Sequence, residues 1–360
     1  SFKGNYSVVF RCYNQGVAYR FVTDFKEKEI VINNEKAVFH FPSGTKGYAA
    51  YSNYGDDNNL FSQYLNSFEN TYDNQLLPQL NNRRLIFYPF LVELPDNVEK
   101  VCITESDLWD YPGMFLQSNP DSFSMKGVWA PLPEKTEQGG HNQLQQIVMK
   151  RYDYIARTNG KRTFPWRIFT ITEQDRELLD NDLVYLTAAP SLLKDISWIK
   201  PGKVAWDWWN DWNISGVDFR AGINNETYKY YIDFAAKNQI EYVILDEGWA
   251  VNQQADMLQV IPEIDLTELV SYAKSRNVDI ILWAGYWAFH RDMEKVVKHY
   301  AEMGVKGFKV DFLDRDDQDM IRFMWEAAEL CSRYHMILNY HGACKPFGIQ
   351  RTYPNVMNFE

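Results

Sequence analysis

The chain has 360 residues, more than one typical domain needs, and its 46% hydrophobic and 24% charged residues give the balance of an ordinary globular protein. Its formal net charge of -11 argues against a nucleic-acid partner, which would require a basic surface. No run of about 18 apolar residues occurs, so the sequence predicts no membrane span.

Residues 1–195 are predicted to form an N-terminal β-sandwich domain, because short runs of β-branched and aromatic residues alternate there with turn signals. The clearest element is a hairpin, in which strand 7–13 turns at 14–16 and returns through 17–21. Further expected elements are strands at 29–32, 37–41, 85–92, 101–105 and 166–172, a hairpin or loop over 134–163, and a short helix within 173–183.

Residues 196–360 are predicted to form the first five to six βα units of a (β/α)8 TIM-type barrel, which is incomplete in this chain. A linker over 191–203 spans the boundary between the two predicted domains. Expected strands lie at 204–209, 242–249, 280–284, 307–312, 336–341 and 356–360, and expected helices at 225–237, 266–275, 293–303 and 319–334. A doubly wound sheet is the alternative, but no glycine-rich phosphate loop follows the first strand.

Polar or acidic residues end several of these strands, and a barrel gathers such ends around one mouth. They are Asp207, Asp246 with Glu247, Asp311, His341 and Glu360. Asp246 and Glu247 are adjacent, so at most one is expected to point inward from a regular strand. No serine-nucleophile elbow, zinc-protease motif or dinucleotide motif occurs. Carboxylates and tryptophans at a barrel mouth are the equipment of a glycosidase.

Asp311 is the strongest catalytic candidate, because it ends an apolar strand that runs directly into a helix. Lys309 lies two residues earlier, so both side chains are expected on one face, where the lysine charge favours the carboxylate. The acids that follow, Asp314, Asp316 and Asp317, are interpreted as N-cap and first-turn acids of the helix.

The sequence resembles glycoside hydrolase family 97, the bacterial α-glucosidases and α-galactosidases, along its whole length. The resemblance is carried by Trp206-Asp207-Trp208-Trp209, by 245–249 (LDEGW), by 309–318 (KVDFLDRDDQ), by 351–355 (RTYPN) and by Asn358-Phe359-Glu360. It implies a β-sandwich, a (β/α)8 catalytic barrel, a small C-terminal β-domain and an active-site Ca²⁺. It also implies a periplasmic or secreted protein that acts on an oligosaccharide or other glycoside.

The resemblance further implies a retaining α-galactosidase in which Asp311 is the nucleophile, since retaining members carry an aspartate on the fourth strand. Asp246 and Lys309 would then bind sugar hydroxyls, although Asp246 could instead be a supporting or helix-capping acid. Trp249 and Trp283 could stack on the sugar or belong to the core. His341 could contact substrate or serve the structure.

Glu105 and Glu360 match calcium ligands of the family, whereas local pattern alone suggests that Glu105 is an exposed loop acid. The family's general acid/base glutamate would fall beyond residue 360. Because Ser1 is not an initiator and the first residues already follow a strand pattern, we expect the chain to be part of a longer protein that lacks both ends here. Nothing in the sequence sets an oligomeric state.

Two alternatives remain. An inverting α-glucosidase of the same family would need a glutamate after the histidine that ends the fifth strand, where this chain has His341-Gly342. A non-catalytic carbohydrate-binding protein built on a decayed barrel is the alternative from another class.

Overall fold

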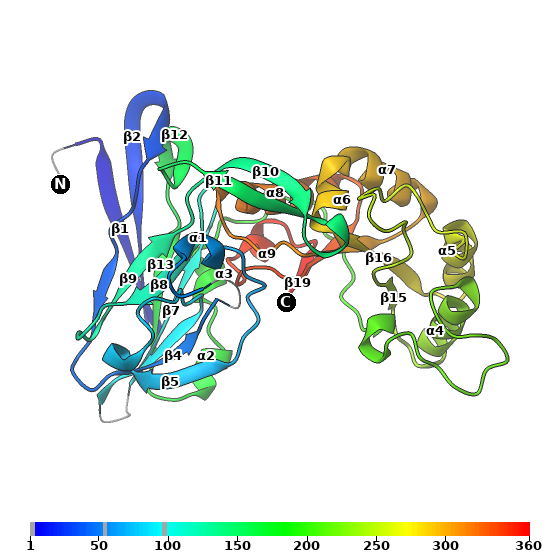
Figure 1. The fold of residues 1–360 in the computed structure, drawn as a ribbon, viewed down its shortest axis with the longest axis horizontal. Coiled ribbons are helices and arrows are strands. Elements are labelled where there is room, and N and C mark those ends of the chain that lie inside the picture. The colour runs from blue at the N-terminus through cyan, green and yellow to red at the C-terminus, as the bar shows by residue number, and fades with distance from the viewer. Residues whose placement is uncertain (1–3, 53–55, 96–98) are drawn as a thin grey trace.

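The computed structural model describes residues 4–52, 56–95 and 99–360. The N-terminal half is built mostly of strands, and the C-terminal half alternates strands with helices along a curled parallel sheet (Figure 1). Both halves contribute buried side chains to one large hydrophobic cluster, which includes Phe90 and Ile103 from the first and Leu245 and Phe308 from the second. The two halves therefore share a continuous core.

The largest sheet of the N-terminal half is antiparallel, in the order β1-β2-β13-β7-β6-β4-β5, with β12 also paired to β2. Its strands are β1 (Tyr6–Tyr13), β2 (Gly16–Ile32), β4 (Lys46–Ala50), β5 (Tyr72–Leu76), β6 (Phe90–Glu93), β7 (Lys100–Ser106), β12 (Ala156–Thr163) and β13 (Trp166–Thr172). The predicted β1–β2 hairpin is confirmed, with Tyr13 paired to Gly16. The strand predicted at 29–32 is the far end of β2, because that strand continues through 17 residues.

Two smaller sheets complete this half. β3 (Val38–His40), β9 (Ser124–Trp129) and β8 (Met114–Ser118) form one of them, and β10 (Pro133–Gly139) with β11 (Gln145–Arg151) forms the other, a long hairpin. Short helices α1 (Leu60–Gln63), α2 (Arg176–Leu179) and α3 (Leu183–Thr187) lie between strands. The strand predicted over 85–92 is shorter than expected and begins at Phe90, since in 85–89 only Ile86 pairs, through two isolated bridges to Tyr51 and Leu116.

The C-terminal sheet is parallel, in the sequential order β14-β15-β16-β17-β18-β19. Its strands are β14 (Val204–Trp206), β15 (Tyr242–Leu245), β16 (Asp279–Gly285), β17 (Gly307–Asp311), β18 (Ile337–Tyr340) and β19 (Val356–Phe359). The connecting helices are α4 (Asn225–Lys237), α5 (Leu266–Lys274), α6 (Tyr286–Arg291), α7 (Met293–Met303), α8 (Gln318–Arg333) and α9 (Ile349–Thr352). The βα repeat predicted from the sequence is confirmed, and α6 and α9 are additions to it.

Local chemistry explains where the long helices begin and end. Asn224, Asp265 and Asp317 precede α4, α5 and α8, and each side chain accepts a hydrogen bond from a backbone N–H of the first turn. Gly304 ends α7 with φ of 104°, a left-handed conformation that costs a glycine little. These signals fix the helix boundaries and so the length of each crossover between strands.

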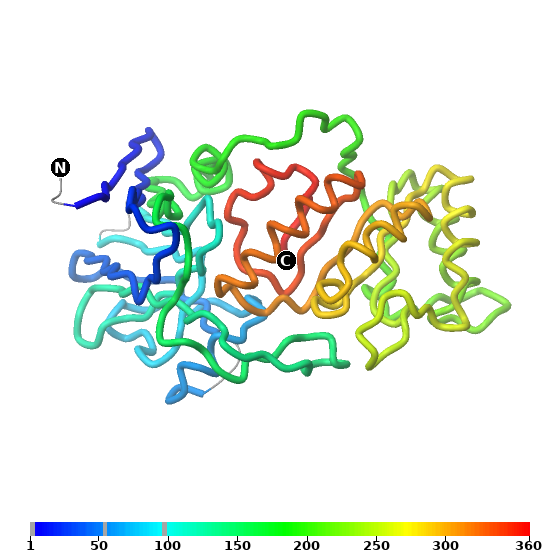
Figure 2. Tube along the Cα trace, turned by 90° about the horizontal axis from the view of Figure 1, so that it is seen from above, coloured from blue at the N-terminus to red at the C-terminus, as the bar shows by residue number. Residues whose placement is uncertain are grey.

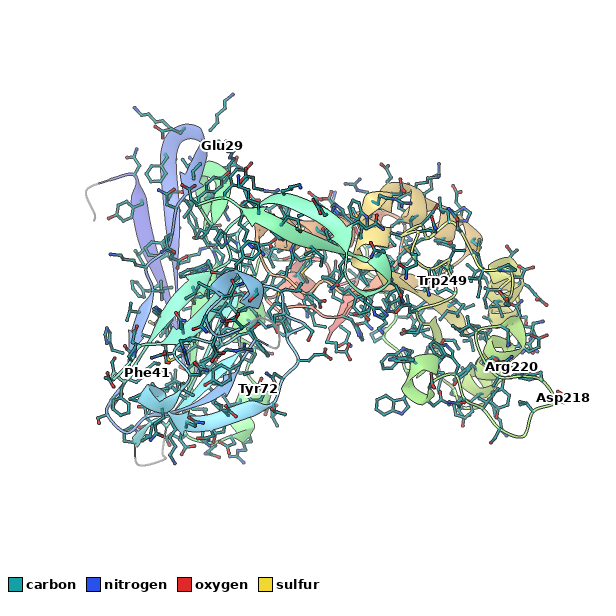
Figure 3. All side chains as sticks on the ribbon, in the orientation of Figure 1. Glu29, Phe41, Tyr72, Asp218, Arg220 and Trp249 are labelled. Carbon is teal, nitrogen blue, oxygen red and sulfur yellow. The ribbon has the colours of Figure 1, made fainter. Side chains whose placement is uncertain are left out.

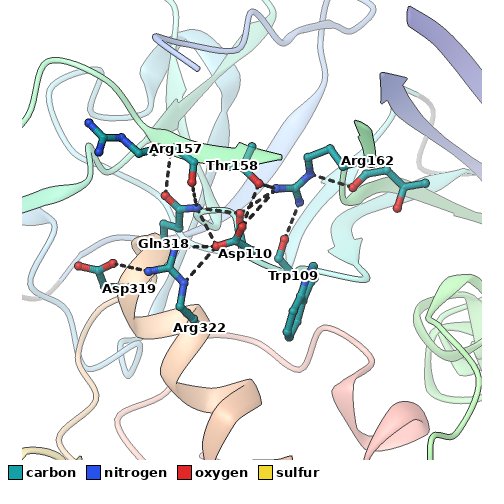
Figure 4. Close-up of polar contacts among 9 residues, drawn as sticks. Trp109, Asp110, Arg157, Thr158, Arg162, Gln318, Asp319 and Arg322 are labelled. Carbon is teal, nitrogen blue, oxygen red and sulfur yellow. Dashed lines mark hydrogen bonds and ion pairs between the residues drawn. The ribbon is translucent and has the colours of Figure 1, made fainter. Parts of the chain in front are cut away.

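A partly buried polar cluster around Asp110 joins the two halves (Figure 4). Its carboxylate accepts hydrogen bonds from Gln318 and Arg322 of α8, at 2.8 and 2.7 Å, and from Thr158 of β12, at 2.9 Å. Arg162 adds a 3.0 Å hydrogen bond to the Asp110 carbonyl. Because one acid is shared by donors from both halves, the cluster fixes α8 against the N-terminal sheet.

The segment over 188–203 runs along one side of the molecule to the start of the parallel sheet, seen as the green tube at the edge of Figure 2. Both views place the end of β19 near the middle of the molecule, beside the N-terminal half (Figures 1 and 2). Among the described residues, no helix has the length and apolar character needed to cross a membrane.

Candidate active site

A pocket of about 850 Å³ lies at the carboxyl ends of the parallel strands. Most of the predicted strand-end acids line it together, and these are Asp246, Glu247, Asp311 and Glu360. The parallel arrangement explains this, since strands that run in one direction bring their carboxyl ends to one edge of the sheet. The prediction of one shared mouth is confirmed for these four acids, whereas Asp207 and His341, predicted at the same mouth, do not line the pocket.

Asp311 ends β17 and is held by three donors. The indole nitrogen of Trp283 lies 3.1 Å from Oδ2, Lys309 Nζ lies 3.3 Å from the same oxygen, and the backbone N–H of Phe312 lies 2.7 Å from Oδ1. Lys309 and Asp311 share one face of the strand, as predicted from their spacing. The carboxylate is fixed in direction while it faces the pocket.

Asp246 lies beside this group and shares its cation. Its Oδ2 accepts hydrogen bonds from Lys309 Nζ at 2.8 Å and from the Trp206 indole nitrogen at 2.5 Å. Lys309 Nζ also lies 4.4 Å from the centre of the Trp206 ring. One buried ammonium group, only 3% exposed, thus lies between two carboxylates and over an aromatic face.

Asp207 supports Asp246 from below. Its carboxylate accepts the backbone N–H of Asp246 at 3.2 Å, the Tyr228 hydroxyl at 2.6 Å and the Trp212 indole N–H at 2.9 Å. Burial raises the pKa of Asp207 to about 6, and the nearby charge of Asp246 contributes to the rise. Asp207 is therefore a buried support of the pocket floor.

Both Asp246 and Glu247 line the pocket, although a regular strand would turn only one of them inward. The alternation of a strand does not apply here, since β15 ends at Leu245 and both acids lie in the following turn. Asp246 faces Lys309, whereas the carboxylate of Glu247 accepts a 2.6 Å hydrogen bond from Asn142. The two adjacent acids thus face different parts of one pocket.

The interpretation of the three acids before α8 as helix caps holds only for Asp317, which accepts the Met320 N–H at 3.3 Å. Asp314 lines the pocket with a left-handed φ of 51° and accepts a hydrogen bond from Gln145. Burial and the negative charge of Asp311 raise the pKa of Asp314 to about 7. Asp316 is buried, and its Oδ2 lies 3.9 Å from Lys345 Nζ. Burial raises the pKa of Asp316 to about 7.

The prediction that Trp249 binds substrate is wrong. Its ring is 1% exposed and packs edge-on to Tyr300 at 5.6 Å, and its indole nitrogen donates to the Trp283 carbonyl at 2.9 Å. Figure 3 shows Trp249 inside the C-terminal half. Trp283 does line the pocket, but its indole nitrogen is committed to Asp311.

His341 lies beside the pocket and contacts Glu360, which lines it. The contact of His341 Nδ1 with the Glu360 carboxylate lowers the pKa of Glu360. The His341 ring packs edge-on to Trp206 at 6.2 Å. His341 is only 6% exposed, so it contacts the pocket through these two neighbours.

Glu105 is fully buried, so the interpretation as an exposed loop acid is wrong. Its carboxylate accepts hydrogen bonds from Arg167, from Lys345 and from the Met114 backbone N–H, the last at 2.9 Å. As placed, Glu105 does not fit a calcium ligand, because two cations already neutralise it. The described residues also contain no group of three metal-binding side chains close enough to hold an ion.

Residues that the sequence did not single out also line the pocket. His141 and Asn142 come from the turn of the β10–β11 hairpin, and Ser67 and Glu69 come from the loop before β5. These four belong to the N-terminal half, so no pattern within the βα repeat points to them. The nearest signal is Gly139-Gly140, which marks the hairpin turn without giving its destination.

Comparison with known proteins agrees with this architecture. Residues 1–190 match the family description Glycosyl-hydrolase 97 N-terminal, and residues 208–360 match Glycoside hydrolase 97. A structure of a variant of a family 97 enzyme from a Pseudoalteromonas species superposes with a TM-score of 0.81 at 22% identity, covering 99% of this chain and 55% of that one. At this identity the likeness shows the fold.

Two curated relatives are similar in sequence. "Retaining alpha-galactosidase" of Bacteroides thetaiotaomicron is 57% identical over 359 residues, which are 100% of this chain and 54% of that protein. "Probable retaining alpha-galactosidase" of Streptomyces bingchenggensis is 31% identical over 261 residues, or 66% of this chain and 38% of that protein. The chain thus spans about half the length of its more similar relative. With both family descriptions matched along nearly its whole length, the chain belongs to glycoside hydrolase family 97.

Proposed function

We propose that this chain carries the nucleophile half of a retaining α-galactosidase, which cleaves terminal α-galactosides by double displacement through Asp311. The observation that carries the proposal is the Asp311 carboxylate, held by Trp283 and Lys309 at the mouth of the parallel sheet. The names of the two curated relatives support the substrate class.

In the first step, an Asp311 oxygen attacks the anomeric carbon of the galactosyl group and forms an ester, while the bond to the leaving oxygen breaks. That oxygen receives a proton from the acid/base glutamate, which we place beyond residue 360. In the second step, water gives its proton to the same base and attacks the anomeric carbon, which releases galactose and the Asp311 carboxylate.

Lys309 and Asp246 are proposed to bind the galactose hydroxyls. Their 2.8 Å ion pair presents a donor and an acceptor side by side, and the Trp206 indole completes the cluster. A buried site with paired polar groups discriminates strongly against a sugar that leaves one of them unpaired. Trp283 is proposed to direct the nucleophile rather than to stack on the sugar.

The backbone at Gly342 favours the retaining mechanism over the inverting alternative. Gly342 has φ of 54°, and a Cβ atom there would lie 2.4 Å from Asp314 Oδ1. A glutamate side chain at this position, as an inverting member would require, has no room unless Asp314 moves. This geometry therefore favours a mechanism with a nucleophile on β17 over one with a catalytic base directly after β18.

Calcium dependence is a proposal of its own, and no step above uses an ion. Ca²⁺ would supply a fixed positive charge beside substrate and catalytic acids. Glu360 is the better candidate ligand, since its side chain is 44% exposed, whereas a role for Glu105 would require Lys345 to move away. Dialysis of the full-length enzyme against a chelator, followed by Ca²⁺ or Mg²⁺, tests this through both activity and melting temperature.

For the whole protein we propose a β-sandwich at 1–195 and the first units of a (β/α)8 barrel at 196–360. Phe90 of the large sheet and Met125 of the three-stranded sheet share one core, which supports the sandwich. The sequential order of the parallel strands supports the barrel. Periplasmic or secreted localisation remains a proposal from the family.

The deciding experiment follows the first sugar anomer released from an aryl α-galactoside by full-length enzyme, using proton NMR. We expect α-galactose first, and β-galactose first would contradict a nucleophilic Asp311. Replacing Asp311 by Gly and adding azide should yield β-galactosyl azide, because azide then attacks from the vacated side. Binding of galactose without turnover of any galactoside or glucoside would support the non-catalytic alternative.

A further inference from the structure

The β10–β11 hairpin reaches from the N-terminal half to the pocket of the parallel sheet (Figure 1). Its strands pair from Gly139 with Gln145 to Pro133 with Arg151. The turn at 140–144 places His141 and Asn142 among the pocket-lining residues. The hairpin thus supplies one wall of the pocket, although it lies far away in the sequence. Asn142 of its turn contacts Glu247, which is 105 residues later.

The hairpin tip is fastened to the C-terminal half where its turn leads into β11. The Trp287 N–H donates to the Leu144 carbonyl at 2.8 Å, and Arg315 donates to the Gln146 carbonyl at 3.0 Å. A Cβ atom at Gly285 would lie 2.7 Å from Leu144 Cβ, so the strand end and the tip are in close contact. The tip is therefore a fixed wall of the pocket.

Polar groups of the tip are arranged around Glu247. Asn142 Nδ2 donates to Glu247 Oε1 at 2.6 Å, His141 Nε2 lies 3.5 Å from Oε2, and Gln253 donates to Asn142 Oδ1 at 3.1 Å. Asn142 has a left-handed backbone conformation in this tight turn, with φ of 47°. His141 is 61% exposed while its ring edge meets Phe312 at 5.4 Å. The group keeps exposed donors and acceptors beside the pocket.

This group is separate from the cluster around the nucleophile. Asp246 faces Lys309 and Asp311, whereas the adjacent Glu247 faces the hairpin tip. The pocket, at about 850 Å³, is near the upper end of the roughly 300–1,000 Å³ range of small-molecule sites, so it has room beyond one sugar ring. One part of the pocket therefore remains after the galactosyl group is placed against Asp311.

The charge of the lining limits what that part accepts. Acids far outnumber bases among the described lining residues, and the single lysine or arginine is Lys309, which is already shared by Asp246 and Asp311. A phosphate or carboxylate on the ligand would meet uncompensated negative charge, whereas hydroxyl groups both donate and accept. We propose that His141, Asn142 and Glu247 form the subsite for the leaving group, and that they select a neutral, polyhydroxylated sugar there.

This proposal rests on the proposed galactosidase function and is tested with full-length enzyme and three substrates. Melibiose carries a sugar leaving group and galactose 1-phosphate an anionic one, whereas the leaving group of α-galactosyl fluoride is a single atom, too small to fill the subsite. Replacing Asn142 by Ala should lower kcat/KM for melibiose about three- to tenfold, which corresponds to one lost hydrogen bond, and leave the fluoride within about twofold. Wild-type enzyme should prefer melibiose to galactose 1-phosphate.

The control is Lys135→Ala, since Lys135 lies on the same hairpin but its side chain, within the part of the chain that the structure describes, pairs only with exposed Glu137. It should leave all three rates unchanged. Equal losses on melibiose and the fluoride in Asn142→Ala would overturn the proposal, because the tip would then shape the galactose site. Unchanged rates on every substrate would overturn it too. A wild-type enzyme that releases no galactose from any substrate refutes the galactosidase function itself.

Discussion

Trp283 donates a hydrogen bond from its indole nitrogen to Asp311 Oδ2 over 3.1 Å, and both residues line the same pocket. An indole N–H can only donate a hydrogen bond, so this contact orients one carboxylate oxygen and adds no second charge beside it. Trp283 belongs to β16 and Asp311 to β17, and the parallel register pairs Gly285 with Asp311. The neighbouring strand thus orients the proposed nucleophile.

We expect Trp283→Phe to lower kcat/KM for α-galactosides about three- to tenfold, because the carboxylate loses one directing hydrogen bond while the core keeps an aromatic ring. Steady-state kinetics with α-galactosyl fluoride measure the loss. Trp198→Phe is a matched control, since its indole nitrogen donates, among the described residues, only to the Asp195 carbonyl in the linker. Equal activity of Trp283→Phe and wild type would contradict a directing role.

Gly342→Ala should destabilise the fold and reduce activity. The new Cβ atom would lie 2.4 Å from Asp314 Oδ1, and φ of 54° is unfavourable for a residue with a side chain, by about 1 kcal/mol. Thermal melting measures the first effect. If the clash is the cause, the double variant Gly342→Ala with Asp314→Ala should lose less stability than the sum of the two single variants. Strict additivity would show that the two residues do not interact.

The stability of the protein should depend on the ionisation of Asp314. Because burial raises its pKa to about 7 from an ordinary value near 3.8, the folded protein holds this proton more tightly than the unfolded chain does. The stabilising contribution of the protonated form is therefore complete below about pH 4 and is lost as the pH rises through about 7. Ionised Asp314 then destabilises the folded state.

Asp314→Asn should accordingly raise the melting temperature at pH 8, on the order of 2 °C, and change it less at pH 5. Asparagine keeps an oxygen that accepts from Gln145 but carries no charge. Differential scanning calorimetry at both pH values measures the difference. The same change at pH 5 and pH 8 would mean that Asp314 does not titrate between them.

Asp110→Ala should weaken the connection between the two halves by about 2–3 kcal/mol, since several donors lose their shared acceptor. Buried Gln318 and partly buried Arg322 are the donors most affected. Urea unfolding followed by tryptophan fluorescence measures the change. Asp218→Ala is the control, because Asp218 is an exposed loop residue at the edge of the C-terminal half (Figure 3). Two separate transitions in Asp110→Ala would show that this cluster couples the halves.

The βα repeat was predictable because its signals are local. Helices at 225–237 and 293–303 follow from apolar spacing and capping residues, and the structure places α4 and α7 over those residues. The relation of Lys309 to Asp311 was predictable for the same reason, since spacing of two along a strand sets a common face. The alternation of side chains along a strand did not apply to Asp246 and Glu247, because β15 ends before them at Leu245.

The sequence by itself determined the strand and helix order, the family and the acids at the strand ends, because each depends on residues close together in the chain. Only the tertiary structure decided that Trp249 is a core residue, that Glu105 is neutralised by Arg167 and Lys345, and that Asn142 meets Glu247. The contacts of Glu105 with Lys345 and of Asn142 with Glu247 cross between the two halves, over 240 and 105 residues of sequence, whereas Trp249 is buried within the C-terminal half. No local pattern encodes these contacts, because each depends on how distant segments pack.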